Sequence, residues 1–282
     1  MQIFNSIKKM QEWSLQARKQ GKSIGLVPTM GYLHDGHLSL VQAARRNCDL
    51  VVVSIFVNPL QFGQGEDFED YPRDLSRDTD LLADAGVDAV FAPAAREMYP
   101  AGFSSSVEVS GEITRKMCGI SRPGHFKGVT TVCTKLFHAC MPDKAFFGQK
   151  DAQQLLIIKK MVRELNFPLE IIRVPIVREH DGLALSSRNV YLDAGQRQEA
   201  LALNKALSQA KEQIAGGERD IARLKDRISG IITASPQAEI DYIEIVNGED
   251  LSELEAVDGI VLIAVAVKFG KTRLIDNLLV EV

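Results

Sequence analysis

The sequence predicts an α/β protein, in which a doubly wound parallel sheet is followed by a smaller α+β domain. Up to about residue 176, short runs rich in β-branched residues alternate with amphipathic segments, as in strands joined by crossover helices. Beyond that point two helical segments come first and two strand-like runs follow, which indicates a separate unit. We therefore expect a Rossmann-like domain at 1–176 and a smaller C-terminal α+β lid domain at 177–282.

The expected strands of the first domain are short and apolar. Segment 23–29, SIGLVPT, is expected to be a strand that ends near Pro28. The near-continuous apolar run 49–59, DLVVVSIFVNP, is typical of a central parallel strand that is covered on both faces. Further strands are expected at 87–93, 144–148 and 169–177.

The segments between these strands have helical spacing. Segment 72–86 ends at a glycine, which is a usual helix stop. The other helices of the first domain are expected at 36–47, 128–140 and 151–165. In the last third, helices are expected at 196–215 and 219–235, and strands at 240–247 and 260–270.

Composition narrows the class of protein. Of the 282 residues, 45% are hydrophobic and 25% charged, which is typical of a soluble globular protein. The net charge of -4 argues against a basic nucleic-acid surface, so any anionic ligand must be met by local positive groups.

Nothing in the sequence predicts a membrane or secreted protein. The apolar run at 259–270 is too short to span a bilayer, and the first twenty residues are charged throughout. None of the four cysteines forms a CxxC pair, which favours free thiols in a reducing compartment. We expect a cytoplasmic protein with no nucleic-acid or membrane partner.

The loop VPTMGYLHDGH, between an expected strand and an expected helix, carries His34 and His37. It lies at the carboxyl end of the first strand, where open α/β sheets bind ligands. The start of the following helix offers unpaired N–H groups, which suit phosphate. A lone HxxH can equally be structural, and a zinc site would need further ligands that the sequence does not supply. Position therefore favours phosphate binding, and no resident metal site is expected.

Two further segments could bind phosphate. DGLALSSRN contains Ser186, Ser187 and Arg188, two hydroxyls and a guanidinium that could hold a triphosphate tail. FFGQKDAQQ places Lys150 and Asp151 just after an expected strand. Taken singly, each has an ordinary alternative: a polar inter-domain loop for the first, and a solvated lysine at a helix start for the second.

Five blocks together resemble one family. PTMGYLHDGH, SIFVNPLQF, RPGHFKGV, FFGQKDAQQ and DGLALSSRN occur in the order and spacing of the pantothenate synthetase (pantoate–β-alanine ligase) family, within the nucleotidylyltransferase superfamily. The resemblance runs through the whole chain. It implies an AMP-forming ligase that joins D-pantoate to β-alanine through a pantoyl adenylate, with release of pyrophosphate. It also implies ATP as a substrate, Mg²⁺ carried by the ATP phosphates, and a homodimer.

The resemblance further implies residue roles. His37, His34 and Lys150 would be catalytic groups on the phosphates. Nucleotide contacts are implied for Met30, Gly31, His34, His37, Gly148, Gln149, Lys150, Asp151, Val177, Leu185, Ser186, Ser187 and Arg188. Contacts to the other substrates are implied for Pro28, Thr29, Phe56, Asn58, Gln61, Phe62, Arg122 and Gln154.

Some of these roles are more specific. Gln61 and Gln154 would bind pantoate, because an amide both donates and accepts. Asn58 is assigned to the amine site. For Arg122 both the β-alanine carboxylate and a phosphate stay open as partners, and a site-lining role for His125 is left open.

Two rival functions remain. Another nucleotidylyltransferase could share HDGH but act on a phosphate acceptor, although Gln61 and Gln154 are poorly suited to one. A non-catalytic nucleotide-binding module would not need the group formed by His37, Lys150 and the SSR sequence.

Overall fold

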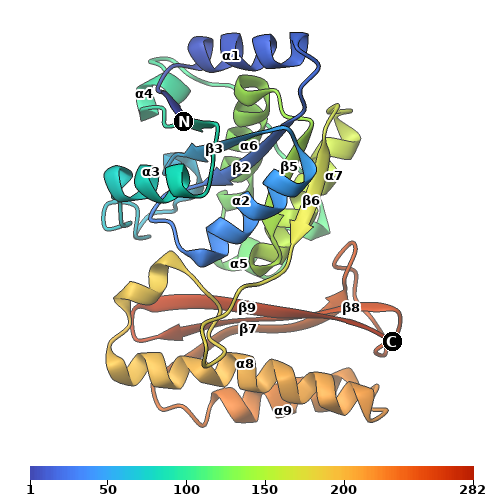
Figure 1. The fold of residues 1–282 in the computed structure, drawn as a ribbon. Helices are drawn as coiled ribbons and strands as arrows, with labels where there is room; N and C mark the ends of the chain where they lie inside the picture. The colour runs from blue at the N-terminus through green and yellow to red at the C-terminus, as the bar shows by residue number, and fades with distance from the viewer.

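The computed structural model describes residues 1–282 and contains two sheets (Figure 1). The larger sheet is parallel, with strand order β1-β4-β3-β2-β5-β6, and the smaller one is antiparallel, with order β7-β8-β9. The predicted fold class is confirmed. The division of the chain at residue 176 stays a prediction.

The larger sheet is covered by helices on both faces. Its strands are β1 (Gln2–Phe4), β2 (Ile24–Thr29), β3 (Leu50–Ile55), β4 (Ala89–Phe91), β5 (Lys144–Gly148) and β6 (Glu170–Val174). Its helices are α1 (Ile7–Lys19), α2 (Asp35–Asn47), α3 (Leu75–Asp84), α4 (Ala95–Met98), α5 (Cys118–Ser121), α6 (His125–Cys140) and α7 (Ala152–Glu164), with short 3₁₀ turns η1 (Pro59–Gln61), η2 (Glu112–Thr114) and η3 (Gln149–Asp151).

Alternation along the strands explains the two layers. Leu26 and Phe147 point to the core beneath α1, α6 and α7, whereas Val27 and Phe146 point to the core beneath α2 and α3. Successive side chains of a strand face opposite sides of the sheet, so a strand buried on both faces must be apolar throughout. Strand β3 is almost continuously apolar because both of its faces are buried.

The C-terminal domain packs its sheet between two helices and the larger domain (Figure 1). Its elements are η4 (Ser187–Tyr191), α8 (Ala194–Ala215), α9 (Ile221–Ile232), β7 (Ala238–Asn247), β8 (Ile260–Phe269) and β9 (Thr272–Glu281). In β8, Val261 and Ile263 face α8 and α9, whereas Leu262 and Ala264 belong to a small cluster with Ala152 of the larger domain. None of the helices is long and apolar enough to cross a membrane.

The structure contains elements that the sequence pattern does not predict. They include β1, α1 and β9, together with short helical turns. Strand β1 has only three residues and pairs at the edge of the sheet, so it leaves little periodic signal. Strand β9 carries Asp276 and Asn277, which are buried polar residues that interrupt its apolar alternation.

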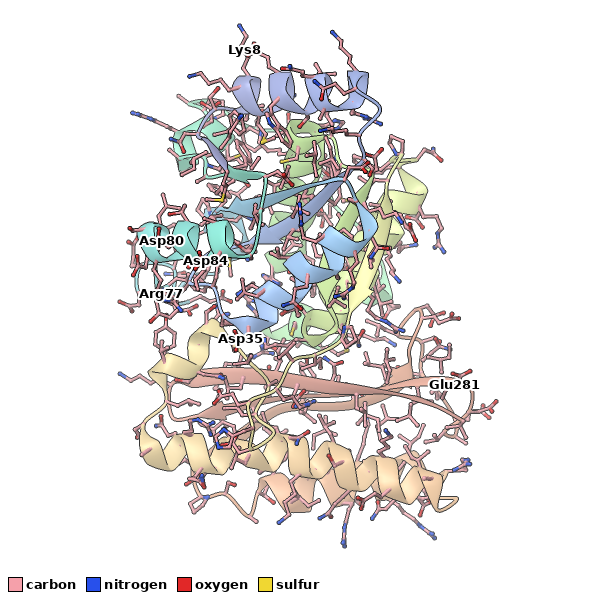
Figure 2. The ribbon with its side chains drawn as sticks, in the orientation of Figure 1. Lys8, Asp35, Arg77, Asp80, Asp84 and Glu281 are labelled. Carbon is pink, nitrogen blue, oxygen red and sulfur yellow. The ribbon has the colours of Figure 1, made fainter.

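The N-terminus of α2 lies on the side of the larger domain that faces the smaller one. Asp35, in its first turn, projects toward the C-terminal domain (Figure 2). The parallel strands β2 and β5 are neighbours although they are far apart along the chain. Such a reversal of strand order opens a crevice at the carboxyl ends of the strands, which is where ligands bind in this fold.

Helix α6 touches η1 directly, and a glycine makes this contact possible. A Cβ atom added to Gly128 would lie 2.2 Å from the carbonyl oxygen of Leu60. No side chain fits at that distance, so either the helix or the turn would have to move. Gly230, in α9, is also helical, but an added Cβ would meet no heavy atom within 4 Å.

We predict opposite effects for alanine at these two glycines. Gly128→Ala should lower the free energy of unfolding by about 1–3 kcal/mol, since the added methyl group overpacks a closed contact. Gly230→Ala should raise it by up to about 1 kcal/mol through helix propensity alone. Urea unfolding measures both changes. Equal stability of Gly128→Ala and the wild type would contradict the packing described here.

Candidate active site

A cavity opens at the carboxyl ends of β2 and β5, between the two domains. It has a volume of about 220 Å³ and adjoins a second cavity of about 540 Å³ that is lined partly by the same residues. The volume of the second cavity, even without the first, is within the ~300–1,000 Å³ common for small-molecule sites. No group of three or more His, Cys, Asp or Glu side chains is placed to hold a metal ion.

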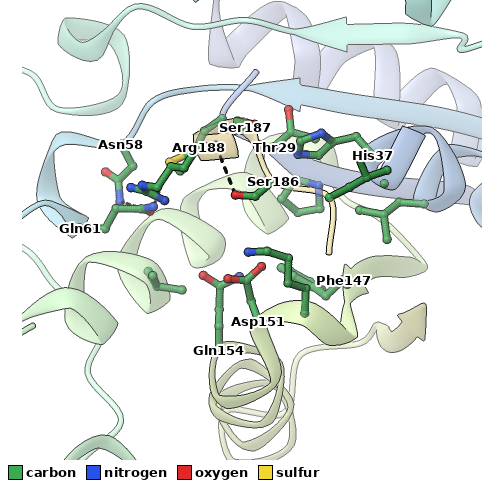
Figure 3. Close-up of a pocket in the computed structure, with 18 of the residues that line it drawn as sticks. Thr29, His37, Asn58, Gln61, Phe147, Asp151, Gln154, Ser186, Ser187 and Arg188 are labelled. Carbon is green, nitrogen blue, oxygen red and sulfur yellow. Dashed lines mark hydrogen bonds between the residues drawn. The ribbon is translucent and has the colours of Figure 1, made fainter. Parts of the chain in front are cut away.

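Most of the predicted site residues line the first cavity, although they come from separate parts of the chain (Figure 3). They are Pro28, Thr29, Met30, His34, His37, Phe56, Asn58, Gln61, Arg122, Gly148, Lys150, Asp151, Gln154, Val177, Leu185, Ser186, Ser187 and Arg188. The fold therefore brings together all five sequence blocks.

Three predicted residues do not line the cavity. Gly31 has a φ of 83°, a left-handed conformation that glycine adopts easily, and it forms the turn after β2. Phe62 packs edge-on against Phe68 and Tyr71. The side chain of Gln149 is buried and donates to Asn277 of β9 across 2.9 Å. A direct ATP contact by the Gln149 side chain does not fit this arrangement, because the amide is already engaged at the domain boundary.

His34 and His37 are held by backbone N–H groups of the first turn of α2. Nδ1 of His34 accepts from the Gly36 N–H at 3.1 Å, and Nδ1 of His37 accepts from the His34 N–H at 3.3 Å. A backbone N–H can only donate, so each Nδ1 carries no proton and each neutral ring has its hydrogen on Nε2. A Cβ on Gly36 would lie 2.8 Å from the His34 ring, which explains the glycine.

The surroundings keep both rings uncharged. Burial, together with the Lys150 charge, lowers the pKa of His34 to about 4. Burial, then the neighbouring His34 and Lys150, also lowers the pKa of His37 well below its usual value. At pH 7 both rings are therefore neutral and each carries an N–H group on Nε2.

A buried carboxylate fixes the loop that leads into α2. Asp78, on α3, accepts the backbone N–H groups of Tyr32 at 2.7 Å and Leu33 at 2.8 Å. It is only 1% exposed, so this contact orders the loop from inside the protein. The sequence pattern did not identify Asp78, because it appears there as one more polar residue of an amphipathic helix.

Lys150 is the cation of the cavity that has no ion-pair partner. It lies in η3 immediately before α7, and it forms none of the ion pairs of the structure. Both α2 and α7 begin at the cavity, and the N-terminal end of a helix adds a partial positive charge. This side of the cavity therefore suits an anionic group.

Arg188 and Arg122 differ in how many of their guanidinium N–H groups lack a partner within the protein. Arg188 donates from Nε and Nη2 to Asp67 at 2.8 and 2.9 Å, which leaves the Nη1 side available. Arg122 binds Glu66 in the same way, but its Nη1 also lies 3.1 Å from His125 and its Nη2 donates to the Gln61 carbonyl. Arg188 can thus bind a further anion through Nη1, whereas Arg122 keeps only one N–H of Nη1 without a partner.

Helix α6 supplies an apolar part of the cavity lining. The sequence predicts only a helix for this segment, because the spacing i, i+3, i+4, i+7 of its apolar lining residues is the same for a core face and for a pocket wall. They are Val129, Val132, Cys133 and Leu136. Other lining residues that sequence reasoning did not assign are Leu40, Tyr71, Phe147, Pro175 and Ile176; Gly36 and His125 also lie in the lining.

A family model and full-length relatives of this chain all point to one enzyme family. The family model described as pantoate-beta-alanine ligase matches residues 2–279. The pantothenate synthetase of Syntrophomonas wolfei is 67% identical over 282 residues, and that of Heliobacterium modesticaldum is 58% identical, each over the full length of both chains.

Solved structures agree with these matches. The pantothenate synthetase of Thermus thermophilus superposes with a TM-score of 0.94 at 46% identity, covering 99% of each chain. The pantoate-beta-alanine ligase of Francisella tularensis, in a complex with beta-gamma ATP and beta-alanine, superposes with a TM-score of 0.83 at 35% identity, covering 99% of this chain and 97% of that one. The chain described here belongs to the pantoate–β-alanine ligase family.

Proposed function

We propose that this protein condenses D-pantoate with β-alanine to give pantothenate, through a pantoyl adenylate. The pantoate carboxylate attacks the α-phosphorus of ATP and displaces pyrophosphate; the β-alanine amine then attacks the mixed anhydride and releases AMP. One observation carries the proposal most directly: a single cavity is lined by phosphate donors, by Gln61 and Gln154, and by apolar side chains of α6.

The phosphate side would bind ATP. Nε2–H groups of His34 and His37 would donate to phosphoryl oxygens, and Lys150 would neutralise the charge that develops there. The free edge of Arg188, with Ser186 and Ser187 beside it, would hold the triphosphate tail. Mg²⁺ would enter on the ATP phosphates, since Mg²⁺ commonly relies on substrate oxygens and water.

The other side would bind pantoate. Gln61 and Gln154 would meet its carboxylate and hydroxyl groups, while Phe56 and the apolar face of α6 would pack against its methyl groups. A phosphate acceptor, the rival substrate, would need free cations there. Arg122, which donates to the Gln61 carbonyl, is already paired with Glu66.

The assembly and location of the protein belong to the same proposal. We expect residues 177–282 to act as a lid, because the segment with Val177, Leu185 and Arg188 lines the cavity and leads into the smaller domain. The family resemblance supports a homodimer. All four cysteines are free thiols, which supports a reducing cytoplasm.

ATP–pyrophosphate exchange tests the proposed function. With Mg²⁺, ATP and D-pantoate present and β-alanine absent, labelled pyrophosphate should enter ATP, because adenylate formation is reversible on the enzyme. Adding β-alanine should then give AMP and pantothenate. Exchange that does not depend on pantoate, or no exchange by folded protein, would contradict the proposal.

His37→Ala and Lys150→Ala should each reduce single-turnover adenylate formation by about 100-fold or more, since one lost transition-state donor commonly costs that much. Matched controls are His138→Ala, an exposed histidine on α6, and Lys159→Ala, an exposed lysine on α7. Both controls should keep the wild-type rate. Near-normal adenylate formation by either site variant would remove that residue from the catalytic group.

A further inference from the structure

Gln61 is oriented by a chain of hydrogen bonds that starts outside the cavity. The Tyr99 hydroxyl donates to Oδ1 of Asn58 at 2.7 Å, and Nδ2 of Asn58 donates to Oε1 of Gln61 at 3.1 Å. Asn58 is 1% exposed, while Tyr99 is half-buried and does not line the cavity. Figure 3 shows Asn58 and Gln61 side by side on the wall opposite His37.

The direction of the Asn58 amide is fixed by backbone groups. Nδ2 of Asn58 also donates to the Gly128 carbonyl at 3.1 Å, which can only accept. Its Oδ1 also accepts from the Leu60 N–H at 3.3 Å, which can only donate. Asn58 cannot be turned over without losing both bonds, so the hydroxyl of Tyr99 must be a donor.

The orientation of Asn58 determines that of the Gln61 amide. The atom of Gln61 that faces Nδ2 of Asn58 must be its oxygen, because two amide nitrogens would oppose each other. Its Nε2 consequently points away from Asn58, and it lies 3.0 Å from Sδ of Met30 in the cavity lining. A thioether is a weak acceptor, so this N–H group is available for a stronger one, such as a carboxylate.

We infer that Tyr99 is a positioning residue for the carboxylate substrate: its hydroxyl, acting through Asn58, keeps the N–H₂ group of Gln61 turned toward the cavity. The inference rests on the proposed function. It also gives Asn58 a role as the link between Tyr99 and Gln61 rather than as a ligand, because its side-chain amide is satisfied within the protein.

The aromatic ring of Tyr99 has a separate, structural role. Its centroid lies 6.0 Å from that of Phe56 and 5.0 Å from that of Phe103. Tyr99→Phe keeps this packing and removes only the hydroxyl group. Without it, Oδ1 of Asn58 keeps only the 3.3 Å bond from Leu60, so the Asn58 amide, and Gln61 with it, is held less firmly.

We expect Tyr99→Phe to raise the KM for pantoate in the exchange reaction by about fivefold, the effect of one modest hydrogen bond. The KM for ATP and kcat should stay within about twofold of the wild type, because the phosphate side is untouched. Ser14→Ala is the matched control: it removes another buried hydroxyl, which donates to the Cys140 carbonyl at 2.8 Å in the core. It should leave all three constants unchanged.

A double-mutant cycle separates positioning from general destabilisation. In a Gln61→Ala background, Tyr99→Phe should change the KM for pantoate by less than about 1.5-fold, since there is no amide left to orient. An equal effect in both backgrounds, or a Tyr99→Phe variant identical to the wild type, would overturn the inference. Failure of the wild type to show pantoate-dependent exchange would instead overturn the proposed function.

Discussion

The first turn of α2, where two backbone N–H groups donate to the Nδ1 atoms of His34 and His37, determines the phosphate side of the cavity. These bonds set the direction of each ring and leave its only hydrogen on Nε2. They also favour glycine at position 36, because a Cβ there would lie 2.8 Å from the His34 ring and displace it. The two histidines therefore cap the N-terminus of α2 and also present Nε2–H donors to the cavity. Since burial keeps both rings neutral, the full positive charge there comes from Lys150 and the free edge of Arg188.

The smaller domain is hydrogen-bonded to the turn that carries Lys150. Asn277 of β9 donates to the backbone carbonyls of Gln149 at 3.0 Å and Lys150 at 2.8 Å, and its oxygen accepts from the Gln149 amide. The neighbouring Asp276 binds Arg178 through two bonds of 2.6 and 2.9 Å. The turn that carries Lys150 is thus bonded to the C-terminal sheet, so the position of this lysine depends on how the two domains sit together.

Much of this arrangement could be predicted from the sequence, and the exceptions share a physical cause. Alternating strands and helices predicted the sheet, and the five blocks predicted most of the cavity lining. The same patterns could not show that Gln149 turns to Asn277, because the partner lies more than a hundred residues away on an unpredicted strand. Asp78, Tyr99 and the apolar face of α6 were missed for a related reason. Their spacing is that of an ordinary helix or loop, and only the folded chain places them against the site.

The central claim is that backbone N–H groups hold both histidines as neutral Nε2–H donors, and nitrogen NMR of the labelled imidazoles tests it most directly. The rings can be assigned from single substitutions among the five histidines. We predict an unprotonated Nδ1 in both rings at pH 7, and no proton uptake by His34 until the pH approaches about 4. Because this pKa lies below the unfolded value of about 6.5, the unfolded chain binds the proton more tightly, so the contribution of this ring to stability falls as the pH drops below that value. Titration of either ring near pH 6.5, or a proton on Nδ1 at pH 7, would contradict the account.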